Sequence, residues 1–497
     1  MGGRENSADV VVVGGGPAGS VVAWELARTG TRVLVLERTA FPREKVCGDY
    51  VEPRGLRILR AMDCLERLER DRPLPITHSA TFVGWGCRYR GEIPFYGESD
   101  RLPSYGYIIP RAELDTVMLE TAEQAGAIVH QGISVTAVHA GASGVEIEAV
   151  RGKKAVRYRA HLVVGADGVN SVVAKSSGLL AEDPRHTAVA RRAYAVVTDD
   201  DVGEAVFFFD EDLFPGYGWM FPMAGGRVNL GVGILSETRQ RMGIHVPALF
   251  TAFADGLRRF HPRCGGLELC APPIGGIVKT YGAAGPNHFD GGVLIGDAGS
   301  FVDPMTGEGI TPAMESGLLA APILMGALEA GRFDAQQLAG YELAFRRYFD
   351  PAMTFLDLCA SLLRNRHLAR PWLRTLIRGC ELAQTDRTFA RTGGSYFGGL
   401  DVRPPGILAT MWLRIIEDLA LVLPRSLTGV MRRERPSGAT SFADVLDWQV
   451  AMSASILTDP LWHARWSMDV QRKWMRLLAR MTSAEEDPRA IGLLATQ

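Results

Sequence analysis

The stretch from Asp9 to Arg38 constrains the fold of this chain more than any other segment. An apolar run, Val10–Val13, leads into a glycine-rich turn and a helical segment, and a second apolar run, Val33–Leu36, ends at Glu37. This order predicts a strand, a helix and a parallel strand, with the helix N-terminus facing a pyrophosphate and the carboxylate facing a ribose hydroxyl. The predicted dinucleotide-binding residues are Gly14, Gly16, Pro17, Ala18, Gly19, Glu37 and Arg38.

Length and composition limit the classes of partner. The chain has 497 residues, enough for several compact units, and its formal net charge of −2 argues against nucleic acid as the main partner. Its seven cysteines include no CxxC pair, which favours reduced thiols and argues against a metal site or a disulfide framework. The polar first residues predict no signal peptide, and the absence of a run of about 18 apolar residues predicts no membrane-spanning helix. We therefore expect a cytoplasmic protein.

Three further stretches carry motifs in a fixed order: PRAELDTVML with Arg111, GADGVNS with Asp167 and Gly168, and GDAGSFVDPMTGEG with Asp297. Together with the glycine-rich turn, they resemble FAD-dependent oxidoreductases of the glutathione-reductase-like, para-hydroxybenzoate-hydroxylase-like type, and within it the geranylgeranyl reductase family. The resemblance implies that FAD is the cofactor. It places Arg111, Val135, Asp167, Gly168 and Asp297 beside FAD.

The resemblance also implies that the backbone at Gly307 and Gly309 comes close to the flavin. A helix beginning near Ile310 would direct its N-terminus at the flavin pyrimidine and favour the reduced form. The segment KVCGDYVEP is similar to the family's KxCG segment, which adds Cys47 and Gly48 to the site. The sequence leaves three roles open for Cys47: a proton donor, a redox regulator or a small packed residue.

The implied fold class is α/β, with a Rossmann-like FAD-binding domain, an antiparallel β-sheet substrate domain and a helical C-terminal extension. Alternation of polar and apolar residues between 188 and 233 favours the antiparallel sheet. We expect the FAD-binding domain to comprise residues 8–72, 108–180 and 288–340, the sheet domain residues 73–107 and 181–287, and the helical region residues 341–497.

A segment of aromatic residues indicates the substrate class. Tyr217, Trp219 and Phe221 match the YxWxFP motif of geranylgeranyl reductases. In a strand these alternate residues share one face, which forms an aromatic wall suited to a flat or long apolar substrate, although ordinary sheet packing would give the same pattern. Flavin-dependent halogenases carry WxWxIP here and need an early lysine, whereas this chain has no lysine between Lys45 and Lys153.

These motifs predict an enzyme that uses FAD to reduce carbon–carbon double bonds of an apolar polyprenyl-like substrate. Cys47, Tyr217 or a water would supply the proton. A flavin-dependent monooxygenase or halogenase-like tailoring enzyme of a specialised metabolite and a redox-neutral FAD-containing cyclase are the alternatives. The chain has no second GxGxxG turn, so we expect electrons from transiently bound NAD(P)H, a ferredoxin or another external reductase. The sequence assigns no oligomeric state.

The C-terminal region contains a basic, tryptophan-rich helix. Trp462, Trp466 and Trp474 are expected on one face of this helix, which also carries several basic residues. A basic amphipathic helix can lie on an anionic membrane, which would make the protein peripheral to it. Packing of the indoles on the body of the protein, with the basic residues in solvent, is the favoured interpretation. The basic residues are Arg465, Arg472, Lys473, Arg476 and Arg480.

Overall fold

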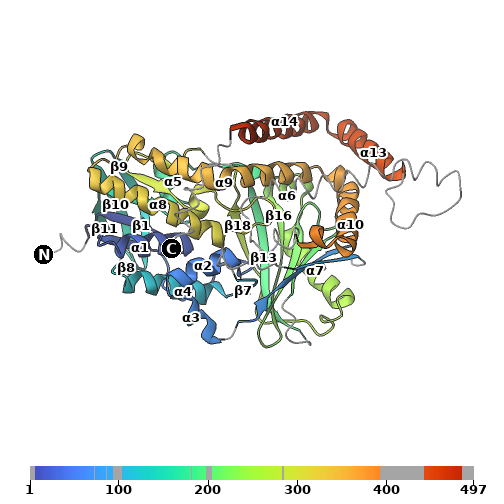
Figure 1. Cartoon of the computed structure of the whole chain (residues 1–497), viewed down its shortest axis with the longest axis horizontal. Coiled ribbons are helices and arrows are strands. Elements are labelled where there is room, and N and C mark those ends of the chain that lie inside the picture. The colour runs from blue at the N-terminus through green and yellow to red at the C-terminus, as the bar shows by residue number, and fades with distance from the viewer. Residues whose placement is uncertain are drawn as a thin grey trace.

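Two large sheets lie side by side along the molecule in a computed structural model (Figure 1). Figure 1 shows the sheet around β1 on the left and the sheet around β13 and β16 on the right, with α14 along the top. The structure describes residues 6–71, 73–84, 87–92, 103–180, 182–197, 204–282, 285–391 and 442–483.

The first sheet has six strands in the order β19-β20-β12-β1-β2-β8. All neighbours pair in parallel except β19 and β20. Every residue of β1 and of β12 is buried, as expected for central parallel strands. The strands are Val10–Val13 (β1), Val33–Glu37 (β2), Ile128–Gln131 (β8), Leu162–Gly165 (β12), His288–Phe289 (β19) and Gly292–Leu294 (β20). The predicted strand, helix and parallel strand after Asp9 are therefore confirmed.

Helices and two small sheets complete this part of the molecule. Helix α1 packs against α4 and α8. The helices are Pro17–Ala27 (α1), Pro53–Ala61 (α2), Leu65–Leu68 (α3), Arg111–Gln124 (α4), Val172–Ser176 (α5) and Ile310–Ala330 (α8). One small sheet contains Ile133–Gly141 (β9), Gly144–Arg151 (β10) and Lys154–Ala160 (β11), and the other contains Tyr50–Val51 (β3), Pro75–Ile76 (β4) and Gly106–Ile108 (β7). Strand β4 falls in the range expected for the sheet domain but pairs with β7.

The second large sheet has eight strands in the order β17-β13-β16-β15-β14-β5-β6, with β18 also paired to β13. Its pairs are antiparallel except β14 with β5, so the alternation in the sequence correctly predicted an antiparallel sheet. Two separated chain segments build it. The strands are His78–Val83 (β5), Cys87–Glu92 (β6), Thr187–Val196 (β13), Glu204–Phe209 (β14), Tyr217–Met223 (β15), Arg227–Leu235 (β16), Glu268–Leu269 (β17) and Ile274–Lys279 (β18).

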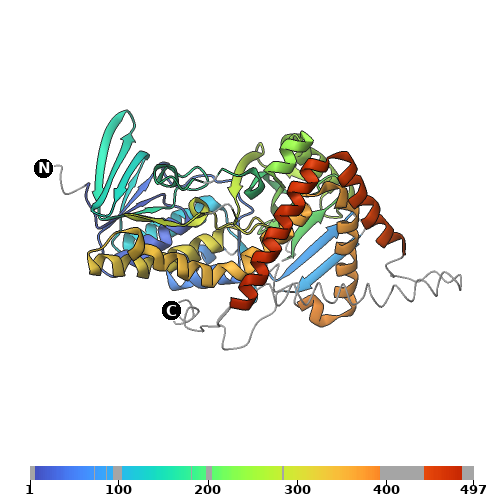
Figure 2. The ribbon, with the colours of Figure 1, turned by 90° about the horizontal axis from the view of Figure 1, so that it is seen from above.

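The remaining helices cover this sheet and connect the two parts. Helix α7 contacts β13 and β16, α10 contacts β5 and β6, and α9 extends from β19 and β20 to α14 (Figure 2). These helices are Ser236–Met242 (α6), Val246–Phe260 (α7), Ala335–Leu363 (α9), Ala369–Thr385 (α10), Phe442–Thr458 (α13) and Pro460–Ser483 (α14). Short 3₁₀ helices span Glu69–Asp71 (η1), Pro184–His186 (η2), Gly296–Gly299 (η3) and Arg366–Leu368 (η4).

Helix α8 is long and apolar enough to cross a membrane by length and composition alone. It is the one such helix among the described residues, and the sequence analysis did not anticipate it. However, 72% of its apolar window is buried inside the protein, against α1, α2 and α9. Its composition is therefore explained by its place as a core helix.

Candidate active site

A cavity of about 720 Å³ lies between the two large sheets. It is lined by the glycine-rich turn, the loop before β3, the start of α4, the loop after β12, strand β15 and the loop before α8. The structure brings all but one of the predicted cofactor and substrate residues to this cavity. They are Gly14, Gly16, Pro17, Ala18, Glu37, Arg38, Cys47, Gly48, Arg111, Val135, Asp167, Gly168, Tyr217, Trp219, Phe221, Asp297, Gly307 and Gly309. Gly19 is the exception, because it packs beneath the turn rather than lining the cavity.

The glycine-rich turn is closed by backbone contacts that exclude side chains. Gly14 has a φ of +104°, and a Cβ atom there would lie 2.3 Å from the carbonyl oxygen of Ala166. A Cβ atom on Gly19 would lie 1.9 Å from the carbonyl oxygen of Gly14. Glu37 accepts a hydrogen bond of 2.8 Å from the backbone N–H of Gly15, so this carboxylate also holds the turn in place. The N-cap of α1, Gly16, has no side-chain cap, which leaves N–H groups at this end for an anion.

Arg111 is held in a fixed orientation at the start of α4. Its Nε donates to Asp115 at 2.7 Å, and a second guanidinium nitrogen donates to the other carboxylate oxygen at 2.9 Å. Arg43 pairs with the same carboxylate at 3.0 Å. Burial raises the pKa of the Cys47 thiol, while the neighbouring positive charge of Arg111 opposes that rise. Cys47 therefore lies in the cavity as a neutral thiol beside an arginine.

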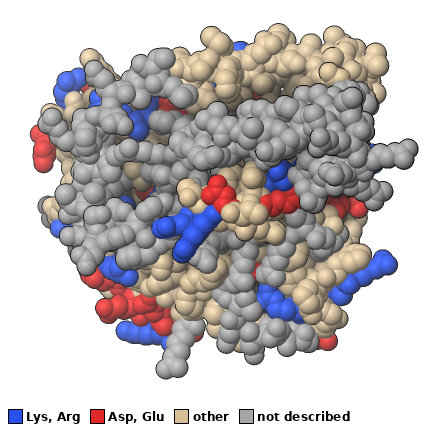
Figure 3. All heavy atoms as spheres, turned by 45° about the vertical axis from the view of Figure 1, so that its right-hand side comes forward, with Lys and Arg blue, Asp and Glu red and all other residues tan. Residues whose placement is uncertain are grey.

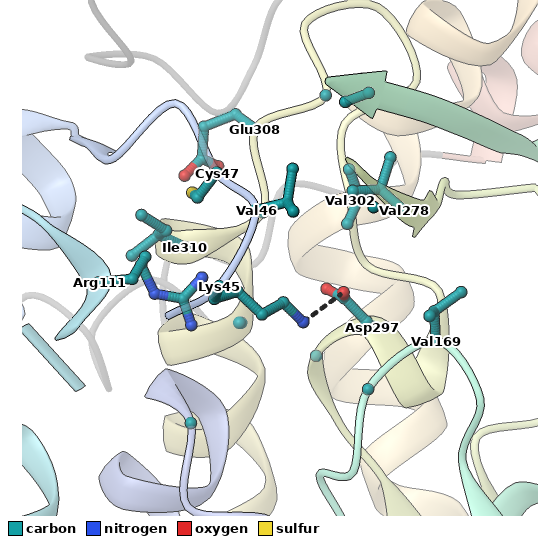
Figure 4. A pocket seen from close by; sticks show the side chains of 18 of the residues that line it. Lys45, Val46, Cys47, Arg111, Val169, Val278, Asp297, Val302, Glu308 and Ile310 are labelled. Carbon is teal, nitrogen blue, oxygen red and sulfur yellow. Dashed lines mark ion pairs between the residues drawn. The ribbon is translucent and has the colours of Figure 1, made fainter. Parts of the chain in front are cut away.

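The two predicted aspartates act in different ways. The Asp167 carboxylate accepts hydrogen bonds from the hydroxyl of Ser171 at 2.5 Å and from the backbone N–H of Val172 at 2.6 Å, so it fixes the loop before α5. Asp297 lies between β20 and α8 and forms an ion pair of 3.8 Å with Lys45 (Figure 4). Both aspartates line the cavity, and Asp297 is the one that pairs with a lysine, Lys45, which lines it too.

The N-terminus of α8 is capped only in part, because Glu308 accepts a hydrogen bond of 2.9 Å from the backbone N–H of Thr311. Its N-cap residue, Gly309, has no side-chain cap, and Gly307 has a φ of +71°. Both line the cavity, so the positive end of the α8 dipole lies at the cavity surface. The structure thus confirms the predicted helix start at Ile310.

The aromatic wall is present on one face of β15. Ring centroids are 6.1 Å apart between Tyr217 and Trp219 and 6.4 Å apart between Trp219 and Phe221. The indole N–H of Trp219 donates to Asn229 at 3.0 Å, which fixes the ring. The hydroxyl of Tyr217 donates to the carbonyl oxygen of Thr306, and burial raises its pKa. Hydrogen bonds therefore hold the rings of Trp219 and Tyr217 in place, and the hydroxyl proton of Tyr217 is already donated to a backbone carbonyl oxygen.

A buried carboxyl cluster at the wall was not predicted from the sequence. Arg54 contacts Glu315 at 2.6 Å and Glu52 at 3.0 Å, whereas Glu308 accepts a hydrogen bond of 2.9 Å from the backbone N–H of Thr311. Burial raises the pKa of Glu52 and raises that of Glu308 well above its usual range, and the two carboxyls repel each other's charge. In the close-up, Glu308 and Cys47 are drawn at the same end of the cavity (Figure 4). The cavity thus contains a carboxyl group, that of Glu308, whose environment favours the protonated form.

Comparison with known proteins assigns the family. An FAD binding domain family matches residues 7–217. A menaquinone reductase of Mycobacterium tuberculosis is 34% identical over 332 residues, which cover 64% of this chain and 77% of that protein. Digeranylgeranylglycerophospholipid reductase 1 of Methanopyrus kandleri is 30% identical over 378 residues, which cover 71% of this chain and 91% of that protein. The chain belongs to the geranylgeranyl reductase family of FAD-dependent oxidoreductases.

Solved structures agree with this family in fold. A geranylgeranyl bacteriochlorophyll reductase-like protein of Thermoplasma acidophilum superposes with a TM-score of 0.64 at 23% identity, over 72% of this chain and 88% of that chain. The myxobacterial chondrochloren halogenase superposes with a TM-score of 0.60 at 22% identity, over 72% of this chain and 83% of that chain. The fold is therefore shared by reductases of this family and by flavin-dependent halogenases.

The cavity of this family member fits FAD. The N-cap residues of α1 and α8, Gly16 and Gly309, supply no side-chain cap, and both helix N-termini lie on one cavity. These ends suit a pyrophosphate and a reduced flavin, which both carry negative charge. Glu37 and Asp297 present carboxylates to the same cavity, as a ribose and a ribityl chain require.

Proposed function

We propose that this enzyme saturates carbon–carbon double bonds of an apolar, polyprenyl-like substrate. The observation that carries the proposal is the aromatic wall of Tyr217, Trp219 and Phe221 on the cavity that also holds the FAD-binding residues. An isolated alkene has no charge to bind, so the protein must align it by shape. The named substrates of the two relatives, a menaquinone and a digeranylgeranyl lipid, support an apolar ligand.

The reaction needs a proton as well as a hydride. Reduced FAD is a hydride donor. Because hydride adds to one alkene carbon, the neighbouring carbon must take a proton from the protein or from water. Tyr217 and Cys47 were the protein groups that the sequence offered as candidates. However, the hydroxyl of Tyr217 donates a hydrogen bond to the carbonyl oxygen of Thr306, and burial raises the pKa of both groups, which makes them poorer acids. We assign the proton to Glu308, because it lines the same cavity, burial favours its protonated form, and a carboxylic acid is a stronger donor than a thiol or a phenol.

The test uses the reduced holoenzyme under anaerobic conditions. The enzyme is reduced with NADPH or with dithionite, which also establishes whether it accepts electrons directly from a nicotinamide. Geranylgeranyl diphosphate, a geranylgeranylated lipid and a menaquinone are then added separately, while flavin absorbance and product mass are recorded. A buffer addition is the control. We expect flavin reoxidation without oxygen and a product that has gained two hydrogen atoms per turnover.

Two outcomes would overturn the proposal. Reoxidation only in air, with oxygen incorporated into a product, would assign the protein to monooxygenase chemistry. Conversion of a polyene without any change in flavin absorbance would assign it to redox-neutral cyclisation.

A further inference from the structure

Helix α14 is fixed to the body of the protein by polar contacts. The indole N–H of Trp466 donates to the carbonyl oxygen of Ser361 at 2.7 Å. The ammonium group of Lys473 pairs with Asp357 at 2.7 Å, and both side chains are buried. These residues join α14 to α9, so the rotation of α14 about its own axis is fixed. The expectation that all basic residues of this helix lie in solvent is wrong for Lys473.

The opposite face of α14 is apolar and exposed. The exposed fractions are 74% for Leu461, 51% for Met468 and 64% for Met475. Their spacing of seven residues places them on one outward stripe. The inner face of α14 carries the buried ion pairs together with buried Trp466 and Leu477, and its outer face carries an exposed apolar stripe that an ordinary surface helix lacks.

Exposed apolar side chains are concentrated in this region. Of the 13 large apolar side chains that are exposed among the described residues, 8 lie on α13 and α14. In Figure 3 the top edge of the molecule is mostly tan, which marks residues other than Lys, Arg, Asp and Glu. We call this surface the C-terminal face, and its exposed apolar residues are Val450, Ile456, Leu457, Leu461, Met468, Trp474, Met475 and Leu478. The three tryptophans were expected on one face of the helix, but Trp474 is half-exposed whereas Trp466 is buried.

The charge beside the apolar stripe is positive. Arg465, Arg472 and Arg476 are exposed on α14 next to Leu461 and Met468. Between residues 461 and 479 the sequence contains one acidic residue, which is buried and paired with the basic residues of the inner face. If α14 packed against α14 of a second copy of the chain, the three arginines of each copy would face each other, and no exposed acidic residue between 461 and 479 could pair with them. An anionic lipid surface complements both the arginines and the apolar stripe.

We propose that the C-terminal face docks on an anionic lipid bilayer, with α14 lying in the plane of the interface. The protein is then peripheral to the membrane, and α8 remains a core helix. Docking does not depend on which reaction the enzyme performs. Ala360 and Leu363 of α9 line the cavity, and the adjacent Ser361 contacts α14. If the proposed function holds, docking therefore places the cavity wall close to a lipid-dissolved substrate.

The test is vesicle co-sedimentation of the full-length holoenzyme. Vesicles of phosphatidylcholine are compared with vesicles that also contain phosphatidylglycerol, at low and high salt. We expect binding to the anionic vesicles that weakens with salt. The double variant Met468→Glu/Met475→Glu should reduce the bound fraction at least about tenfold, because two charged groups would enter the interface. The matched control is Leu343→Glu, at a residue of α9 that is 52% exposed, and it should bind like the wild type.

Further measurements separate docking from unfolding and from self-association. Flavin content and thermal unfolding should be unchanged in the double variant, because both methionines face outward. The triple variant Arg465→Gln/Arg472→Gln/Arg476→Gln should lose the preference for anionic vesicles. Failure of the wild type to bind any vesicle would overturn the proposal, and so would equal binding by the double variant. A wild-type dimer that ignores vesicles and becomes monomeric in the double variant would instead identify this face as a contact between copies.

Discussion

Replacing Glu308 by glutamine tests the proposed proton donor. Glutamine has the same shape, and its carbonyl oxygen can still accept the hydrogen bond from the N–H of Thr311, now 2.9 Å long. Burial raises the pKa of the Glu308 carboxyl group and favours its protonated form, so the exchange should remove a proton donor without removing a charge. We therefore expect little change in the free energy of unfolding, about 1 kcal/mol or less.

The catalytic loss can be estimated from general acid catalysis. A positioned acid contributes roughly 10²–10⁴-fold to a rate. Cys47 remains in the cavity as a weaker donor, so we expect the lower end, a loss of about 10²-fold in the rate of flavin reoxidation by substrate, with flavin reduction unaffected. Because the pKa of Glu308 is raised, the wild-type rate should fall at alkaline pH as this acid ionises, and the variant should lack that fall.

The assay is single-turnover reoxidation of the reduced enzyme by substrate, followed by flavin absorbance across a pH series. Glu44→Gln is the matched control, because Glu44 also lines the cavity but is exposed and pairs with Arg192. It should keep the wild-type rate and pH profile. A Glu308→Gln enzyme that retains more than about a third of the wild-type rate with the same alkaline fall would refute the assignment of this acid.

Three further predictions follow from local geometry. Gly14→Ala should lose FAD, measured as flavin retained on purification, because the new Cβ atom would lie 2.3 Å from a carbonyl oxygen. The control is Gly30→Ala, at a residue with a similar positive φ but open space around it. It should keep FAD and lower the free energy of unfolding by about 1 kcal/mol. Burial raises the pKa of Asp49 to about 6, so its stabilising contribution is present at low pH and is lost as pH rises through 6. Relative to Asp49→Asn, the wild type should therefore lose up to about 3 kcal/mol between pH 4 and 7 in denaturant titrations. Lys473→Met should lower the free energy of unfolding by about 3–5 kcal/mol in the same titrations, because the buried carboxylate of Asp357 would lose this partner. Arg472→Met, at an exposed position, should lower it by less than about 0.5 kcal/mol.

Local patterns predicted many of the residues that line the cavity. Strand periodicity and glycine placement act over a few residues, so the turn at Gly14 and the wall from Tyr217 to Phe221 could be recognised without the fold. The family resemblance then supplied Asp297, and the structure places its carboxylate at the cavity.

The carboxyl cluster could not be predicted in this way. Glu52 and Glu308 lie far apart in the sequence, and each is an ordinary acidic residue in a glycine- or proline-containing loop. Their pKa values depend on burial and on mutual repulsion, which exist only after the chain has folded. The orientation of α14 was missed for a related reason, since its buried partner Asp357 belongs to another helix.

The first sheet has a consequence for the order of folding. Its neighbouring strands β1, β12 and β20 come from the beginning, the middle and the later part of the chain, and α8 follows β20 directly. A ribosome-bound chain that ends before Gly292 therefore lacks both an interior strand of this sheet and the second helix terminus of the cavity. The nascent protein should consequently be unable to retain FAD until most of the antiparallel sheet has already been synthesised, so cofactor capture marks a late step of biogenesis.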